Sequence, residues 1–333
     1  MNEKTAASVM SRSPWAKIFA ISFGVLFLFL VLLGMYWSPM PKLFWVNEYV
    51  DDQRSVVGYS TTDTLIRVAE TLLDKRGGYI TNDKFPPGLW LDNMPNWEKG
   101  VVTQMRDFSR AIRNDFSRSQ SQSKEDPDVV EAVEKFFSES NSWLFPPTER
   151  RYREGAAALF RYQDRLTGAA QPEAQFYARA DNLREWLAEV EKRLGSMSRR
   201  LGNSVASTVI NEELAGDPSA EAAHEQPDII DVRTPWLEID DVFFEARGAA
   251  WALLHFFRAI EFDFSQVLDD KNAEASVRQI IRELEASLDP MRWPVVLNGG
   301  GYGLTANHSL VMANYLARAN AAVINLRELL DQG

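Results

Sequence analysis

Near its start the chain has a long segment of apolar and uncharged residues, Ile18 to Trp37, after which apolar and charged positions alternate in mixed patterns. No charged side chain occurs between Lys17 and Lys42. At a rise of 1.5 Å per residue, a helix of this length measures about 30 Å, which is the thickness of the hydrocarbon core of a bilayer. Trp15 and Tyr36 stand near its two ends, as aromatic residues do at membrane surfaces. The pattern predicts a transmembrane helix.

A cleaved signal peptide is the alternative interpretation of this segment. Signal peptides have apolar cores of about 7–15 residues, followed by a cleavage site of the small-x-small type. Here the apolar run is longer, and no alanine occurs from Ile21 to Val68. These features favour an uncleaved anchor.

The distribution of basic residues predicts the orientation of this helix. Lys4, Arg12 and Lys17 precede it, whereas only Lys42 and Arg54 follow closely on the other side. Because basic residues are retained on the cytoplasmic side, we expect residues 1–17 to form a cytoplasmic tail. The remainder of the chain is then expected outside the cytoplasm.

Three long stretches further along the chain repeat apolar residues at alternating spacings of three and four. They run from Phe176 to Leu201, from Phe243 to Val267 and from Met312 to Leu330. A mean spacing of 3.5 residues places one apolar stripe along each helix, as in coiled coils and up-and-down bundles. Alternation with a period of two is missing over comparable lengths, so sheet is expected only as minor strands. The predicted fold class is all-α: one N-terminal transmembrane helix followed by a long-helix bundle with coiled-coil-like heptad packing.

The remaining elements follow from local start and stop signals. Residues 38–60 are predicted to form a juxtamembrane connector, and residues 61–333 the helical domain. Thr61 or Thr62 could cap a first helix that ends at Gly77-Gly78. An acidic linker, residues 215–228, leaves open whether the domain is single or consists of two halves that meet near 215–235.

Charge and cysteine content exclude several classes of function. The chain has a formal net charge of -11 at pH 7 and no cysteine. An acidic domain repels phosphate groups, so nucleic-acid binding is not expected. The absence of cysteine excludes disulfides, thiolate metal sites and a thiol nucleophile. No H-E-x-x-H pattern occurs, and we expect neither a metal nor another cofactor.

One loop, residues 86–98, combines aromatic and short polar side chains and is the first candidate site. Such a mixture suits a sugar, a peptide or a partner-protein surface. The alternative is a buried crossing loop in which an aspartate or asparagine caps the next helix, and this alternative is the commoner arrangement. The candidate residues are Trp90, Asp92, Asn93, Asn96, Trp97 and Glu98.

Three stretches carry a resemblance to a known family: GGYITND (residues 77–83), PPGLWLDNMPNWE (residues 86–98) and RSQSQS (residues 118–123). They resemble segments of a family of uncharacterised inner-membrane proteins of Gram-negative bacteria, and the resemblance covers nearly the whole chain. It implies a bacterial inner-membrane protein with a periplasmic domain. It implies no catalytic residues.

Two functional hypotheses remain. The preferred one is a single-pass envelope protein whose helical bundle acts as an interaction, scaffold or regulatory module. Its partners would be the lipid bilayer around residues 18–37 and either a protein of the envelope or a second copy of the chain. The competing hypothesis is a membrane-anchored hydrolase or lyase that acts on peptidoglycan or another envelope polymer, with the loop from Trp90 to Glu98 lining its cleft. No G-x-S-x-G motif supports a serine nucleophile.

Overall fold

The structure is a computed structural model that describes residues 14–46, 56–119, 124–168, 174–205, 207–210, 229–291, 295–298 and 306–332. Its helices are α1 (Pro14–Trp37), α2 (Tyr59–Asp74), α3 (Asn93–Ala111), α4 (Pro127–Phe136), α5 (Thr148–Leu166), α6 (Ala180–Gly202), α7 (Ile239–Asp263), α8 (Ser265–Asp270), α9 (Glu274–Ser287) and α10 (His308–Asp331). A π-helical turn, Ile112–Phe116, continues α3, and the short strands β1 (Ser207–Ile210) and β2 (Ile229–Val232) form an antiparallel pair. The acidic linker lies outside the described residues.

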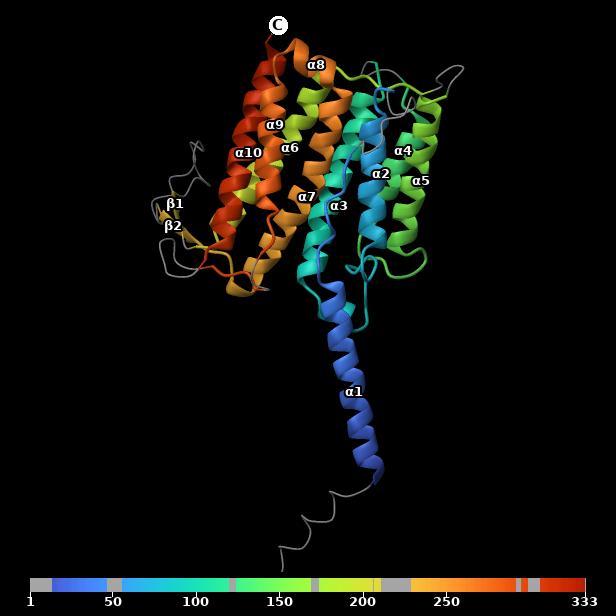
Figure 1. Cartoon of the computed structure of the whole chain (residues 1–333), viewed down its shortest axis with the longest axis vertical. Coiled ribbons are helices and arrows are strands. Elements are labelled where there is room, and N and C mark those ends of the chain that lie inside the picture. Colours follow the sequence, from blue (N-terminus) through green and yellow to red (C-terminus); the bar gives the residue numbers. More distant parts are fainter. Residues whose placement is uncertain are drawn as a thin grey trace, which may run out of the picture.

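The long helices of the domain run alternately up and down (Figure 1). Helix α1 projects from one end of this bundle, which we call the α1 end, and the C-terminus lies at the opposite end. Helices α3, α5, α7 and α10 begin at the α1 end, whereas α2, α4, α6 and α9 finish there. The predicted fold class is confirmed: an apolar N-terminal helix precedes a helical bundle.

The heptad stripes seen in the sequence are the buried faces of the long helices. In α6 every stripe position from Leu183 to Leu201 is buried, and in α10 the same holds from Met312 to Leu330. Helix α6 packs against α10, and α3 packs against α7. The stripes therefore serve contacts within the domain.

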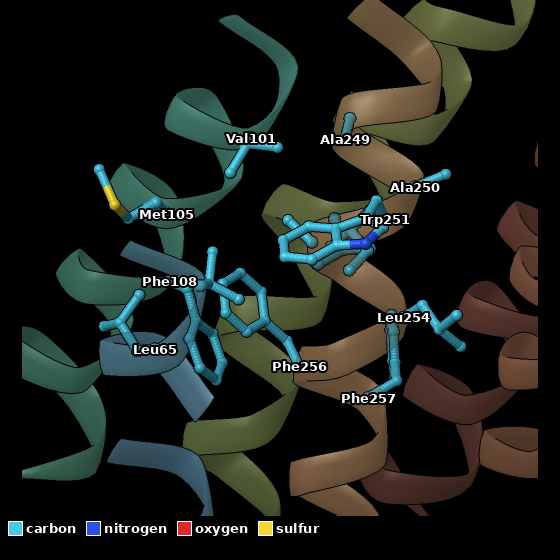
Figure 2. Packing of buried hydrophobic residues seen from close by; sticks show 14 of the residues in the cluster. Leu65, Val101, Met105, Phe108, Ala249, Ala250, Trp251, Leu254, Phe256 and Phe257 are labelled. Carbon is cyan, nitrogen blue, oxygen red and sulfur yellow. The ribbon is translucent and has the colours of Figure 1, made fainter. Parts of the chain in front are cut away.

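One hydrophobic core joins the helices on both sides of the acidic linker. Figure 2 shows its centre, to which α2 contributes Leu65, α3 Phe108 and α7 Phe256. The rings of Phe108 and Phe256 stack with their centroids 4.1 Å apart. Helix α7 is thus packed into the same core as the helices of the first half.

Two glycines allow α3 and α7 to approach each other closely. A Cβ atom added to Gly100 would lie 2.0 Å from the carbonyl oxygen of Glu245, and one added to Gly248 would lie 1.9 Å from that of Trp97. Because real Cβ atoms do not approach backbone atoms so closely, only glycine fits at either position.

The start of α2 differs from the prediction. The helix begins at Tyr59, so Thr61 and Thr62 are buried within its first turn and do not cap it. The backbone N–H of Thr61 instead donates to the Asp263 carboxylate at 2.6 Å, from the end of α7. A carboxylate also suits the positive end of the helix dipole. The cap comes from about two hundred residues away in sequence, which explains why local signals missed it.

The segment after α1 is attached to the side of the bundle by a buried histidine. The backbone N–H of Phe44 donates to Nε2 of His255 at 3.1 Å, and Nδ1 of His255 pairs with the Trp251 carbonyl at 2.6 Å. The Phe44 and His255 rings stack at 3.9 Å. One nitrogen must accept and the other donate, so this arrangement requires the neutral imidazole.

We expect acid to weaken this attachment. Burial, with smaller contributions from Arg258 and Arg67, lowers the pKa of His255 to about 3 from an ordinary 6.5. The unfolded chain therefore binds a proton below pH 6.5 that the folded chain binds only near pH 3. The stabilisation that neutral His255 contributes is present above pH 6.5 and is lost as the pH falls. The free energy of unfolding should decrease by about 2 kcal/mol between pH 7 and pH 5.

The variant His255→Gln, which does not titrate, provides the comparison. Asp263 acts in the opposite direction because burial raises its pKa to about 6, and this contribution is common to both proteins. Denaturant unfolding at pH 7 and pH 5 should show a greater loss of stability in the native chain than in the variant. Equal pH dependence of the two proteins would contradict the prediction.

Candidate functional site

The last turns of α1 are packed into the domain, whereas the rest of the helix is exposed. Gly34 is buried, and a Cβ atom added to it would lie 3.4 Å from the Pro87 side chain and 3.8 Å from that of Leu91. From Trp15 to Phe29 every residue of the helix is exposed. This helix is long and apolar enough to span a membrane.

A second contact fixes the end of α1 against the turn that follows α2. Gly77 has a φ of 84°, and a Cβ atom there would lie 2.7 Å from the ring of Trp37. The guanidinium of Arg76 lies 4.9 Å from the centre of the Tyr36 ring. Glycine is therefore required at position 77 both by the backbone conformation and by the space that Trp37 takes.

Beneath this turn lies a buried ion pair that we call the Lys75–Glu98 clasp. The side chains of Lys75 and Glu98 are 3% and 0% exposed, and they form a salt bridge. The Glu98 carboxylate also accepts hydrogen bonds from the backbone N–H groups of Ile80 and Thr81, each at 2.8 Å. The ion pair and both hydrogen bonds restrain residues 75–81, which form the turn that contacts Trp37.

The next residues connect this turn to the loop between α4 and α5. The Tyr79 hydroxyl donates to the carbonyl of Ser140 at 2.8 Å, and the Asn82 amide donates to Ser142 O and to Glu149 Oε2 at 2.9 Å and 2.8 Å. Burial raises the pKa of Tyr79, so its hydroxyl stays protonated and can donate. The stretch at 77–83 that carries the family resemblance thus links three elements at the α1 end.

The stretch 86–98 is predicted as a loop, but from Asn93 onward it forms the first turns of α3, and its candidate residues fall into different environments. Trp90 is half-exposed, and its ring centroid lies 5.9 Å from that of Phe27 in α1. Asp92 caps α3 by accepting from the backbone N–H of Asn93 at 2.7 Å. Asn96 donates to the Asp241 carboxylate of α7 at 2.6 Å.

The other two candidates are inside the domain. Trp97 is completely buried, with its ring 5.3 Å from that of Trp251, and Glu98 belongs to the clasp. The structure therefore brings the six residues to the same end of the bundle but does not gather them around one cleft. Both carboxylates have structural roles: Asp92 caps α3, and Glu98 forms the clasp with Lys75.

The α1 end also contains a pocket of about 460 Å³ between α7, α9 and α10, which we call the Arg247 pocket. Its walls are largely apolar and include Phe243, Val311 and Met312. The Arg247 guanidinium is buried and donates through Nη2 to the carbonyls of Leu288 and Asp289, at 2.8 Å and 3.1 Å.

The positive charge in this pocket is incompletely balanced. Nε of Arg247 has no hydrogen-bond partner among the described residues, and the hydrogen bonds of the guanidinium go to backbone carbonyls, which carry no full charge. Burial lowers the pKa of Arg247 to about 10, and the nearby Asp289 acts in the opposite direction. The arrangement could bind an anionic group. Sequence reasoning missed it because nothing in the pattern of α7 distinguishes a buried arginine from an exposed one.

Comparison with curated proteins and with solved structures finds no match. A family described as uncharacterised proteins conserved in bacteria (DUF2333) matches residues 10–333, which include α1, the clasp and the helices of the bundle. The chain belongs to this bacterial family.

Proposed function

We propose that the protein is a single-pass protein of the bacterial inner membrane whose helical domain lies outside the cytoplasm and acts as an interaction module for another envelope component. The observation that carries the proposal is the division of α1: residues 18–29 are exposed and almost wholly apolar, whereas Gly34 and Trp37 are packed into the domain. An exposed apolar helix of this length is stable only in lipid. Its fixed end would hold the domain in one orientation at the membrane surface.

The topology can be tested with reporters fused to the C-terminus of the full chain. Alkaline phosphatase is active only outside the cytoplasm, and green fluorescent protein exported in unfolded form stays dark there. We expect an active phosphatase fusion, a dark fluorescent fusion and a membrane fraction that resists carbonate extraction. A fluorescent fusion or a soluble mature chain would refute the proposal.

The Arg247 pocket is the place where we expect the partner to bind, because a buried and poorly balanced cation attracts an acidic group. Val311 lines the pocket and is 55% exposed, so Val311→Glu adds a negative charge at its mouth with little effect on folding. Val57, 47% exposed and outside the pocket, gives the matched control Val57→Glu.

Affinity purification of the full chain from detergent, followed by mass spectrometry, should recover a partner with the native chain and with Val57→Glu. Val311→Glu should recover several-fold less of it. If no protein is enriched with the native chain, the interaction module is refuted. Equal recovery with both variants would remove the pocket from the proposal.

A further inference from the structure

Two loops at the α1 end present large apolar side chains to the outside of the domain. One loop joins α2 to α3, between the two residues of the clasp, and the other joins α4 to α5. Phe145 is 92% exposed, Phe85 66% and Leu89 60%. We call the whole set the apolar edge: Phe85, Leu89, Trp90, Trp143, Leu144 and Phe145.

The apolar edge is a fixed surface because hydrogen bonds and ring contacts join its two loops. The rings of Phe85 and Trp143 meet edge to face, with their centroids 5.7 Å apart. Beside them, Asn82 donates to Ser142 at 2.9 Å. A contiguous exposed patch of this kind marks a site of contact with another apolar phase or partner.

The position of α1 identifies that phase. The ring of Trp90 lies 5.9 Å from that of Phe27. Phe27 precedes Trp37 by ten residues, which corresponds to about 15 Å along a helix. The apolar segment from Ile18 to Trp37 is about as long as the hydrocarbon core is thick, so a spanning α1 must place Phe27 well inside the bilayer. Trp90, whose ring contacts that of Phe27, then lies within the hydrocarbon region of the bilayer.

We propose that the apolar edge inserts into the leaflet of the bilayer on the domain's side of the membrane, so that lipid covers these six side chains. The inference rests on the proposed membrane-spanning role of α1. The edge also carries Trp143, and tryptophan is favoured at the boundary between acyl chains and headgroups. Lys84, which directly precedes Phe85 of the edge, is exposed and can extend toward lipid phosphates. The domain would be bound to the membrane by its loops as well as by its anchor.

The chain has no cysteine, so a single cysteine can be introduced and labelled without first replacing native cysteines. We would place spin labels at Phe145→Cys and Leu89→Cys in the full chain. The matched control is Phe160→Cys, because Phe160 is 60% exposed on α5 and lies outside the edge. Phe23→Cys in the exposed part of α1 reports whether the anchor spans the bilayer.

The labelled proteins are reconstituted in nanodiscs of phosphatidylethanolamine and phosphatidylglycerol, and collisions with oxygen and with a water-soluble nickel chelate are measured. Lipid favours oxygen and water favours the chelate. We expect the ratio of oxygen to chelate collisions at positions 145, 89 and 23 to exceed that at position 160 several-fold.

The possible outcomes separate the two proposals. A lipid signal at position 23 with an aqueous signal at 145 and 89 overturns the insertion of the edge and leaves the anchor intact. An aqueous signal at position 23 overturns the anchor and, with it, the inference. Labels at 145 and 89 that neither reagent reaches would mean that protein covers the edge, which also overturns insertion.

Discussion

Glu98→Gln is expected to lower the free energy of unfolding by about 3–5 kcal/mol, because it removes one partner of a buried ion pair and leaves the other charge uncompensated. Lys75 is 3% exposed, so water cannot replace the lost carboxylate. Glutamine keeps an oxygen that can accept from the backbone of Ile80 or Thr81. The other N–H then faces the glutamine NH2 group, so the loss combines the uncompensated charge of Lys75 with one lost backbone hydrogen bond.

A double variant tests this explanation directly. In Lys75→Met with Glu98→Gln both charges are absent, and an apolar side chain of similar length replaces the lysine. Buried ion pairs replaced by uncharged residues are often close to neutral in stability, so the double variant should be more stable than Glu98→Gln alone. Denaturant unfolding of the full chain in detergent, followed by far-ultraviolet circular dichroism, gives the comparison. A double variant less stable than the single one would show that the hydrogen bonds of the clasp, and not its charges, dominate.

The clasp also bears on how α1 is held against the domain. It restrains the turn in which Gly77 contacts Trp37, and the same stretch leads into the loop that contacts Gly34. Loss of the clasp should therefore loosen α1 from the domain as well as destabilise the bundle.

The long helices could be predicted from the sequence because their signal is local. A stripe with a spacing of 3.5 residues is complete within one helix, and the buried positions of α6 and α10 agree with it. The length and apolar character of α1 are likewise contained in one segment. Such features need no knowledge of which elements meet in space.

The roles of the loop residues could not be predicted because they depend on distant partners. Trp90 and Trp97 are the same residue type seven positions apart, yet one faces α1 and the other lies in the core against Trp251. From the sequence alone Glu98 looks like an exposed acidic residue, and only the fold shows that it is buried against Lys75. In each case the partner lies on another element, and the pairing follows from the packing of helices rather than from spacing.

At Gly248, where α7 approaches α3 closely, a single methyl group should do great harm. Gly248→Ala places a Cβ atom 1.9 Å from Trp97 O and 2.8 Å from its carbonyl carbon, and backbone atoms cannot rotate away. Helices α3 and α7 must then separate, which disturbs the stacking of Phe108 on Phe256. We expect a loss of about 3 kcal/mol in the free energy of unfolding, at the upper end of the usual range for overpacking. The loss opposes the gain of up to about 1 kcal/mol that alanine gives over glycine in a helix.

Gly195→Ala is the matched control, because Gly195 lies within α6 and the nearest atom to an added Cβ is Asn320 Nδ2 at an ordinary 3.5 Å. It should leave stability unchanged or raise it slightly. Combining Gly100→Ala with Gly248→Ala tests the cause. One separation of α3 from α7 relieves both clashes, so the double variant should lose less stability than the two single losses added together. Additive losses would mean that each methyl group is accommodated by its own local distortion, and that the two glycines do not set a common distance between the helices.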